Sequence, residues 1–195
     1  MAGGQWRAFA GAACSAVGLS ALAWLCFGAG TYLAMAKAMP LFVTVMADGA
    51  SGWQRMASVY SALRLAGCAH GVAMAAHVTV ALAAAAMVAV VWRSRHDTPA
   101  KMAVLVAASA LATPYLYVYD TVMLVLPFLW LAQQGADRRW LAALWLLPLV
   151  SIAQNWGLPG VPNLMPLVPI GLLALIARRL AAPGPARFDR LGTLC

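Results

Sequence analysis

Charged residues are scarce in this chain, and acidic residues are the scarcest of all. The 195 residues include 5 Asp plus Glu and 13 Lys plus Arg, so that 9% of the chain is charged and 64% is apolar. A soluble domain of this size needs far more polar surface, which excludes the soluble globular class. The uncharged stretches Ala8–Phe27 and Gly71–Trp92 are each long enough to cross a hydrocarbon core of about 30 Å as a helix. The sequence therefore predicts an all-α, polytopic membrane protein with a single membrane domain over residues 1–195.

Motifs for nucleotides, metals and nucleophilic catalysis are also missing. There is no zinc-ligand spacing, Walker loop, dinucleotide fingerprint or hydrolase elbow, which argues against a transport ATPase. His70 and His77 share one face of a predicted helix, but they are about 10 Å apart along it and cannot share a metal. The four cysteines form no disulfide framework. We expect no metal site and no evident cofactor, and the metal requirement of any reaction is left open.

Basic residues alternate with the apolar stretches. Most of them fall in four clusters, at Arg7, 93–101, 138–139 and 178–190. The positive-inside rule places such clusters in the cytoplasm, and it explains the net charge of +8 without nucleic-acid binding. The pattern predicts a multi-pass protein of the cytoplasmic membrane with about six spanning helices and both termini inside. Residues 178–195 are expected to form a mobile cytoplasmic tail.

The remaining spans are shorter and less regular. Residues 102–136 contain one charge between basic flanks, which predicts a tight helical hairpin with its tip at Thr113–Asp120. Two more helices are expected at 140–153 and 164–177, joined by an outer loop. Gly28–His70 is expected to be one long outer loop.

That long outer loop contains a helix signal. Ser51 and Gln54 have capping-box spacing, and the apolar residues from Trp53 to Gly67 recur with the period of a helix. We expect an amphipathic helix on the outer membrane surface, with Gln54, Arg55, Ser58 and Ser61 toward its polar side and Arg64 one turn beyond Tyr60. Two interpretations are open. The arginines extend to the interface as on any interfacial helix, or they form a cationic, aromatic-flanked ledge that binds a lipid phosphate.

Asp120 is the one acid in the membrane-embedded second half of the chain. Its carboxylate either caps the helix that begins at Thr121 or serves a functional site with the neighbouring tyrosines, which can hydrogen-bond a sugar. His77, in the middle of a spanning helix, is interpreted as a packed, hydrogen-bonded histidine.

Two stretches resemble glycosyltransferase family 87. They are residues 53–64, with Trp53, Met56, Ser58-Val59 and Ala62-Leu63-Arg64, and residues 114–124, with Pro114-Tyr115 and Tyr119-Asp120. The resemblance implies a GT-C fold and transfer of a sugar, often mannose, from a polyprenyl-phosphate carrier to an acceptor on the outer face of the cytoplasmic membrane. It implies that Arg55 and Arg64, in the stretch with Trp53 and Gln54, lie near the carrier phosphate. It places Tyr115, Tyr119 and Asp120 near the sugar or acceptor.

The chain resembles only the C-terminal half of that family. The resemblance implies a catalytic carboxylate in an outer loop of the other half, and Asp48 lies in a different loop, so no catalytic residue is assigned here. We expect that these residues alone do not transfer sugar. A split gene, a frameshifted remnant and a misplaced start codon all fit, and the first implies a separately encoded N-terminal half as partner. The alternatives are a non-catalytic scaffold or lipid-binding or flipping subunit, and a small-solute transporter.

Overall fold

The structure is a computed structural model that describes residues 6–50, 52–155 and 162–181. Over these residues it is all-α, as predicted, with eight α-helices and two short 3-10 helices. The elements are α1 (Trp6–Phe27), α2 (Ala29–Ala47), η1 (Trp53–Arg55), α3 (Val59–Leu65), α4 (His70–Arg93), α5 (Thr98–Ser109), η2 (Val118–Leu124), α6 (Val125–Gln133), α7 (Arg138–Asn155) and α8 (Leu167–Ala181).

Three described helices, α1, α2 and α4, are long and apolar enough to cross a membrane. Two of them confirm the helices predicted at 8–27 and 71–92. The third, α2, lies where the sequence predicted an outer loop, so that prediction is wrong for residues 29–47. Lys37 and Pro40 interrupt the apolar pattern there. The helix nevertheless continues through Pro40, whose carbonyl accepts a hydrogen bond from the Thr44 hydroxyl at 3.0 Å.

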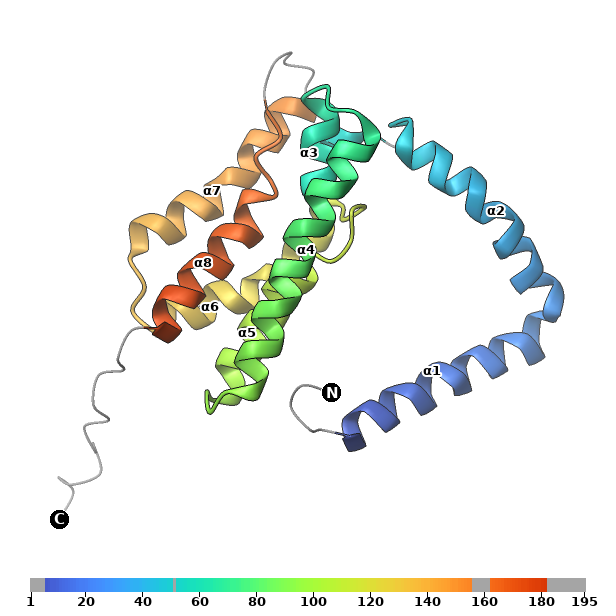
Figure 1. Cartoon of the computed structure of the whole chain (residues 1–195), viewed down its shortest axis with the longest axis horizontal. Helices are drawn as coiled ribbons and strands as arrows, with labels where there is room; N and C mark the ends of the chain where they lie inside the picture. Colours follow the sequence, from blue (N-terminus) through green and yellow to red (C-terminus); the bar gives the residue numbers. More distant parts are fainter. Residues whose placement is uncertain (1–5, 51, 156–161, 182–195) are drawn as a thin grey trace.

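The packed part of the molecule is the bundle of α3–α8 (Figure 1). The central helix is α5, which packs against α4, α6 and α8. Its inner face carries Ala103, Val104 and Ala107, whose small side chains let the neighbouring backbones approach closely. The core between these helices is completed by Leu131 of α6 and by Leu172 and Ile176 of α8.

The hairpin predicted over residues 102–136 is present as α5, a turn, η2 and α6. Its second half starts as a 3-10 helix at Val118, three residues before the predicted start at Thr121. α5 has 12 residues and is about 18 Å long, too short to cross a full hydrocarbon core. The number of crossings in this half of the chain stays a prediction.

Helix α8 extends beyond its predicted end. It includes Arg178 and Arg179, which had been assigned to the tail, and Arg179 donates to the Gln134 carbonyl at the end of α6. The rest of the predicted tail, residues 182–195, lies outside the described residues.

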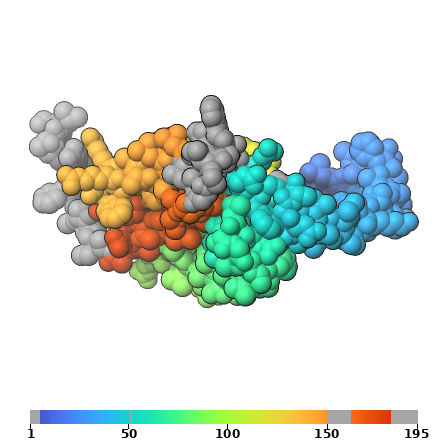
Figure 2. All heavy atoms as spheres, turned by 90° about the horizontal axis from the view of Figure 1, so that it is seen from above, coloured from blue at the N-terminus to red at the C-terminus, as the bar shows by residue number. Residues whose placement is uncertain are grey.

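Helices α1 and α2 form an arm that projects from the bundle (Figures 1 and 2). Gly28, with a φ of 75°, is the only residue between them, and this left-handed backbone turns the chain sharply. The arm reaches the bundle at the C-terminal end of α2. The ring of Phe42 lies edge-on to that of Tyr115 at 6.1 Å, and Met46 is buried.

Candidate substrate site at the loop end of the bundle

Three segments that are distant in the sequence meet at the loop end of the bundle, away from the basic residues that end α4 and α8. We call this place the junction, and define it by residues 53–61, 114–117 and 163–165. Met56 and Tyr117 form an antiparallel bridge, and the Ala57 N–H donates to the Leu116 carbonyl at 2.7 Å. The Ser58 hydroxyl donates to the Pro114 carbonyl. The two sequence stretches singled out above are therefore held against each other.

The third segment enters the junction through Asn163, which is 6% exposed. Its amide nitrogen donates to the Met56 carbonyl at 2.8 Å, and its amide oxygen accepts from the Met165 N–H at 3.1 Å. Every one of these polar groups is buried and paired, and such a network favours a single arrangement over alternatives. Sequence reasoning missed Asn163. The one available signal was an amide side chain in an otherwise apolar segment.

A capping box formed by Ser58 and Ser61 begins α3, whereas Ser51 of the predicted capping box lies outside the described residues. Ser58 is the N-cap residue of α3: its hydroxyl accepts from the Ser61 N–H at 3.1 Å, while the Ser61 hydroxyl accepts from the Ser58 N–H at 3.3 Å. Ser58 and Ser61 are buried rather than on an exposed polar face. The predicted amphipathic helix from 53 to 67 is thus a 3-10 turn, an extended link and the short helix α3. Gly67, with a φ of 85°, follows the end of α3 as expected.

Arg64 links three backbone segments through contacts that we call the Arg64 tie. Its guanidinium donates to the Cys68 carbonyl at 2.9 Å and to the Ala47 carbonyl at 3.1 Å, and it lies 4.5 Å from the centre of the Trp53 ring. Trp53 in turn donates from Nε1 to the Met46 carbonyl at 3.0 Å. The Nε atom of Arg64 is buried and has no hydrogen-bond partner among the described residues. Much of this cation is therefore used to hold the end of α2 on α3.

An aromatic cluster lies beside this tie. Tyr60 is fully buried, its hydroxyl is 2.9 Å from Nδ1 of His70, and its ring lies edge-on to that of Tyr115 at 6.0 Å. Burial raises the pKa of the Tyr60 hydroxyl above its ordinary value of 10.0, and the nearby charge of Arg64 offsets part of this effect. Tyr60 is therefore neutral at physiological pH, and its hydroxyl pairs with His70 inside the cluster.

The other predicted site residues lie at the surface of the junction. Tyr119 is 72% exposed and stacks on Tyr117 with ring centres 5.3 Å apart. The exposed Asp120 carboxylate accepts from the Tyr117 N–H at 3.2 Å, which gives it a capping role at η2. Arg55 is exposed and directly precedes the bridged Met56, and Gln54 is half-buried beside Gly52. Tyr119 and Asp120 thus share one rim of the junction, separate from the Arg64 tie.

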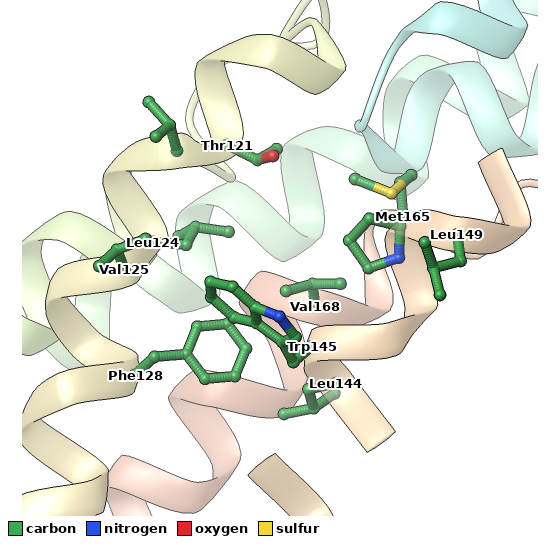
Figure 3. Close-up of a pocket in the computed structure, with 11 residues that line it drawn as sticks. Thr121, Leu124, Val125, Phe128, Leu144, Trp145, Leu149, Met165 and Val168 are labelled. Carbon is green, nitrogen blue, oxygen red and sulfur yellow. The ribbon is translucent and has the colours of Figure 1, made fainter. Parts of the chain in front are cut away.

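An apolar groove of about 320 Å³ runs from the junction between η2, α6, α7 and α8 (Figure 3). It begins at Thr121, the residue after Asp120, and at Met165, which is bonded to Asn163. Farther along, Phe128 and Trp145 face each other edge-on with ring centres 5.2 Å apart. The other lining side chains in Figure 3 are hydrocarbon. Nothing in the sequence pattern predicted this groove, because its walls come from four elements.

Metal ligands do not gather in the described part of the chain, which contains no group of three or more His, Cys, Asp or Glu residues that could hold an ion. His77, predicted to be a hydrogen-bonded core histidine, is indeed buried at 2% exposure. Its two ring nitrogens, however, have no partner among the described residues, so the hydrogen-bonded part of that prediction is wrong there.

Comparison with known families gives one match. The model of glycosyltransferase family 87 matches residues 1–114, which is more than half of the chain and includes α1–α5 and the first of the two stretches. The match ends at Pro114, so the second stretch lies almost entirely beyond it. No curated protein and no solved structure matches the chain significantly.

Proposed function

Because the chain belongs to glycosyltransferase family 87, we propose that it is the lipid-donor half of a membrane glycosyltransferase. Its donor is a polyprenyl-phosphate sugar, and it takes part in hexosyl transfer, with mannose as the first sugar to test. The observation that carries this proposal is the continuity between the polar junction and the apolar groove. A polyprenyl-phosphate sugar has the same division, with a charged head and a hydrocarbon chain.

The groove suits the prenyl chain of such a donor. Its walls are hydrocarbon and aromatic, and its exposed wall residues, Val122, Trp145 and Leu149, are 73%, 55% and 56% exposed. A chain lying there replaces bilayer lipid at little cost, and the aromatic pair Phe128–Trp145 gives it a flat contact surface. The phosphate then lies at the mouth of the groove, beside Thr121 and the junction.

The two arginines of the first stretch have different parts in this proposal. Arg55 is exposed next to the bridged residue Met56 and is the cation that contacts the phosphate. The Arg64 guanidinium donates hydrogen bonds to the carbonyls of Ala47 and Cys68, so Arg64 positions the site rather than binding the donor. The Trp53 ring packs on the Arg64 guanidinium, and Gln54, the next residue along the chain, is half-buried beside Gly52.

Tyr119 and Asp120 form the rim that meets the sugar or the acceptor. In the proposed reaction an acceptor hydroxyl attacks the anomeric carbon of the sugar, the bond from that carbon to the phosphate oxygen breaks, and the lipid phosphate leaves with its electron pair. The proton of the hydroxyl goes to a carboxylate base. Asp120 already caps η2, and we propose that the base comes from outside these 195 residues. Tyr115 supports the rim from the buried side through its contact with Tyr60.

The junction faces the outer side of the cytoplasmic membrane in this proposal. α4 separates it from the basic cluster of Arg93, Arg95 and Lys101, which the positive-inside rule keeps in the cytoplasm. If α2 also crosses, Arg7 falls on the outer side, contrary to the expectation from α1 alone. The side of the junction is unaffected, because it depends on α4.

Donor binding tests the proposal directly. The full chain in lipid nanodiscs is titrated with a fluorescent polyprenyl-phosphate mannose, and with the same prenyl alcohol lacking phosphate and sugar. We expect the phosphorylated donor to bind at least about tenfold more tightly, and Arg55→Gln to remove most of that difference. Arg95→Gln at the other end of α4 is the matched control and should change nothing. Equal binding of the two lipids would overturn the proposal.

Assays of sugar transfer distinguish the two interpretations of this chain. It is either half of an enzyme or a non-catalytic lipid-binding subunit. The capping of η2 by the Asp120 carboxylate favours the alternative. Donor binding without sugar transfer is expected for the chain alone under both interpretations. Transfer that appears when a second polypeptide with an outer-loop Asp or Glu is added supports the enzyme half. Robust transfer by the 195-residue chain alone, lost in Asp48→Asn or Asp120→Asn, would show that the base is in this chain.

A further inference from the structure

The arm contains a charge that the bundle does not neutralise. Lys37 lies in α2, eight residues after Ala29 and ten before Ala47, which puts its Cα about 12 Å and about 15 Å from the two helix ends. A lysine side chain reaches only about 6 Å, so it cannot bring its ammonium to either membrane surface from this depth. Lys37 is exposed in this structure. A cation at such a depth is expensive in lipid, and it marks a place where something else must contact the helix.

The face of α2 that carries Lys37 points away from the bundle. Phe42 contacts Tyr115 and Met46 is buried, so these residues define the bundle side of the helix. At 100° per residue, Lys37 lies on the opposite side. Gly30, Ala34 and Leu41 share its face at helical spacing, and a Cβ added at Gly30 would meet no atom within 4 Å. Two small residues one turn apart let a second helix approach closely, just before the charge.

No acidic residue in the described part of the chain supplies the counter-charge for Lys37. The chain's five acidic residues are Asp48, Asp97, Asp120, Asp137 and Asp189. Asp48 follows the end of α2, Asp97 and Asp137 lie in links between helices, and Asp120 lies in η2 at the hairpin tip. Asp189 is in the basic C-terminal segment. None of the four acidic residues in the described part of the chain is in the middle of an apolar helix, and Asp189 lies between Arg187 and Arg190 in the sequence. The acidic residues of a second copy therefore do not match the depth of Lys37.

We propose that the Gly30–Ala34–Lys37–Leu41 face of α2 docks against a transmembrane helix from outside these 195 residues that carries an Asp or Glu at mid-depth. The pairing neutralises Lys37 in the membrane and covers the arm. The carboxylate of that helix is a structural partner of Lys37, on the side of α2 opposite Phe42, the residue that contacts Tyr115 of the junction. The inference therefore does not depend on the donor or on sugar transfer.

A defined peptide tests this docking. The purified full chain is placed in phosphatidylcholine vesicles with a labelled transmembrane peptide of leucine and alanine, which carries either Asp or Leu at its midpoint, and association is followed by energy transfer. We expect the Asp peptide to bind about tenfold more tightly than the Leu peptide. Lys37→Leu should abolish this preference, and Lys101→Leu, at the chain's other lysine, should keep it. Equal binding of the two peptides, or a preference that survives Lys37→Leu, would overturn the proposal.

Two further measurements test whether something other than a helix contacts Lys37. If replacing part of the phosphatidylcholine by phosphatidylglycerol abolishes the Asp preference, lipid phosphates occupy Lys37 and the docking proposal is wrong. Labelling with a water-soluble amine reagent tests the depth: Lys101 should react and Lys37 should not. Equal reactivity would place Lys37 in water and overturn the proposal as well.

Discussion

The arm and the junction differ in how much of their surface the rest of the chain covers. In the arm, Val17 is 69% exposed and Leu25 is 85% exposed, although both belong to an apolar helix. At the junction Met56, Tyr60 and Ser61 are each 0% exposed. The arm thus owes its form to local helix propensity and the surrounding membrane. The junction depends on contacts between segments more than 50 residues apart, so substitutions of the same type should act very differently in the two regions.

The largest contrast is expected for truncation of a leucine. Leu172→Ala in α8 removes a fully buried side chain and should lower the free energy of unfolding by about 3 kcal/mol. Leu25→Ala in the arm should change it by less than about 0.5 kcal/mol. The measurement is SDS-induced unfolding of the full chain in mixed micelles. Equal losses in the two variants would mean that the arm packs on the bundle in solution.

The buried amide of the junction should have the next largest effect. Asn163→Leu leaves the Met165 N–H without its partner and removes one of the two donors to the Met56 carbonyl, which keeps the Ser61 hydroxyl. The substitution should cost about 2 kcal/mol in the same unfolding assay. The control is Gln133→Leu, which removes an exposed amide at the end of α6 and should be close to neutral. A neutral Asn163→Leu would contradict the junction as described.

Two serine substitutions, one at the junction and one in the arm, compare the two regions again. Ser58→Ala removes the N-cap of α3 and the bond to the Pro114 carbonyl, with an expected cost of about 1 kcal/mol. Ser15→Ala on the exposed surface of α1 should cost nothing measurable. Hydrogen exchange provides the readout: amides 59–65 should exchange faster in Ser58→Ala only. Unchanged exchange there would show that other contacts hold α3.

The smallest predicted effect is a change in stability on glycine-to-alanine substitution, which should have opposite signs in the bundle and in the arm. A Cβ at Gly171 would lie 2.6 Å from Cδ2 of Leu144, so Gly171→Ala displaces the Leu144 side chain between α7 and α8 and should destabilise by less than about 1 kcal/mol. Gly18→Ala meets no atom within 4 Å and should make α1 slightly more stable. Cysteine cross-linking rates between α7 and α8 would report the first change, and helix content the second. The prediction fails if both substitutions act in the same direction.

Much of the fold could be predicted from charge spacing and apolar length. Helices α1 and α4 and the hairpin tip near Pro114 follow from uncharged runs and a helix-breaking residue, which are local properties. Helix α2 was missed because Lys37 and Pro40 resemble loop residues when the apolar pattern is the main criterion. A single charge and a proline do not outweigh 19 residues that can otherwise form a continuous helix.

The candidate site was only partly predictable. The resemblance indicated two stretches that belong together, and the structure brings them into contact through Met56 and Tyr117. It could not indicate that Arg64 is bonded to backbone carbonyls or that Ser58 and Ser61 are buried, because these depend on the end of α2 and on Asn163. Spacing within a helix cannot reveal partners that come from elsewhere in the chain.

The bonds of Arg64 also have a mechanical consequence. The guanidinium binds the last residue of α2 and the turn that follows α3, so it forms a pivot at the base of the arm. From that pivot α2 extends for 19 residues, about 28 Å, to the bend at Gly28. A rotation of about 10° at the pivot moves the bend by about 5 Å. Because Phe42 contacts Tyr115, the same rotation shifts the aromatic rings beside the junction. A helix that binds the far end of the arm therefore couples mechanically to the candidate site.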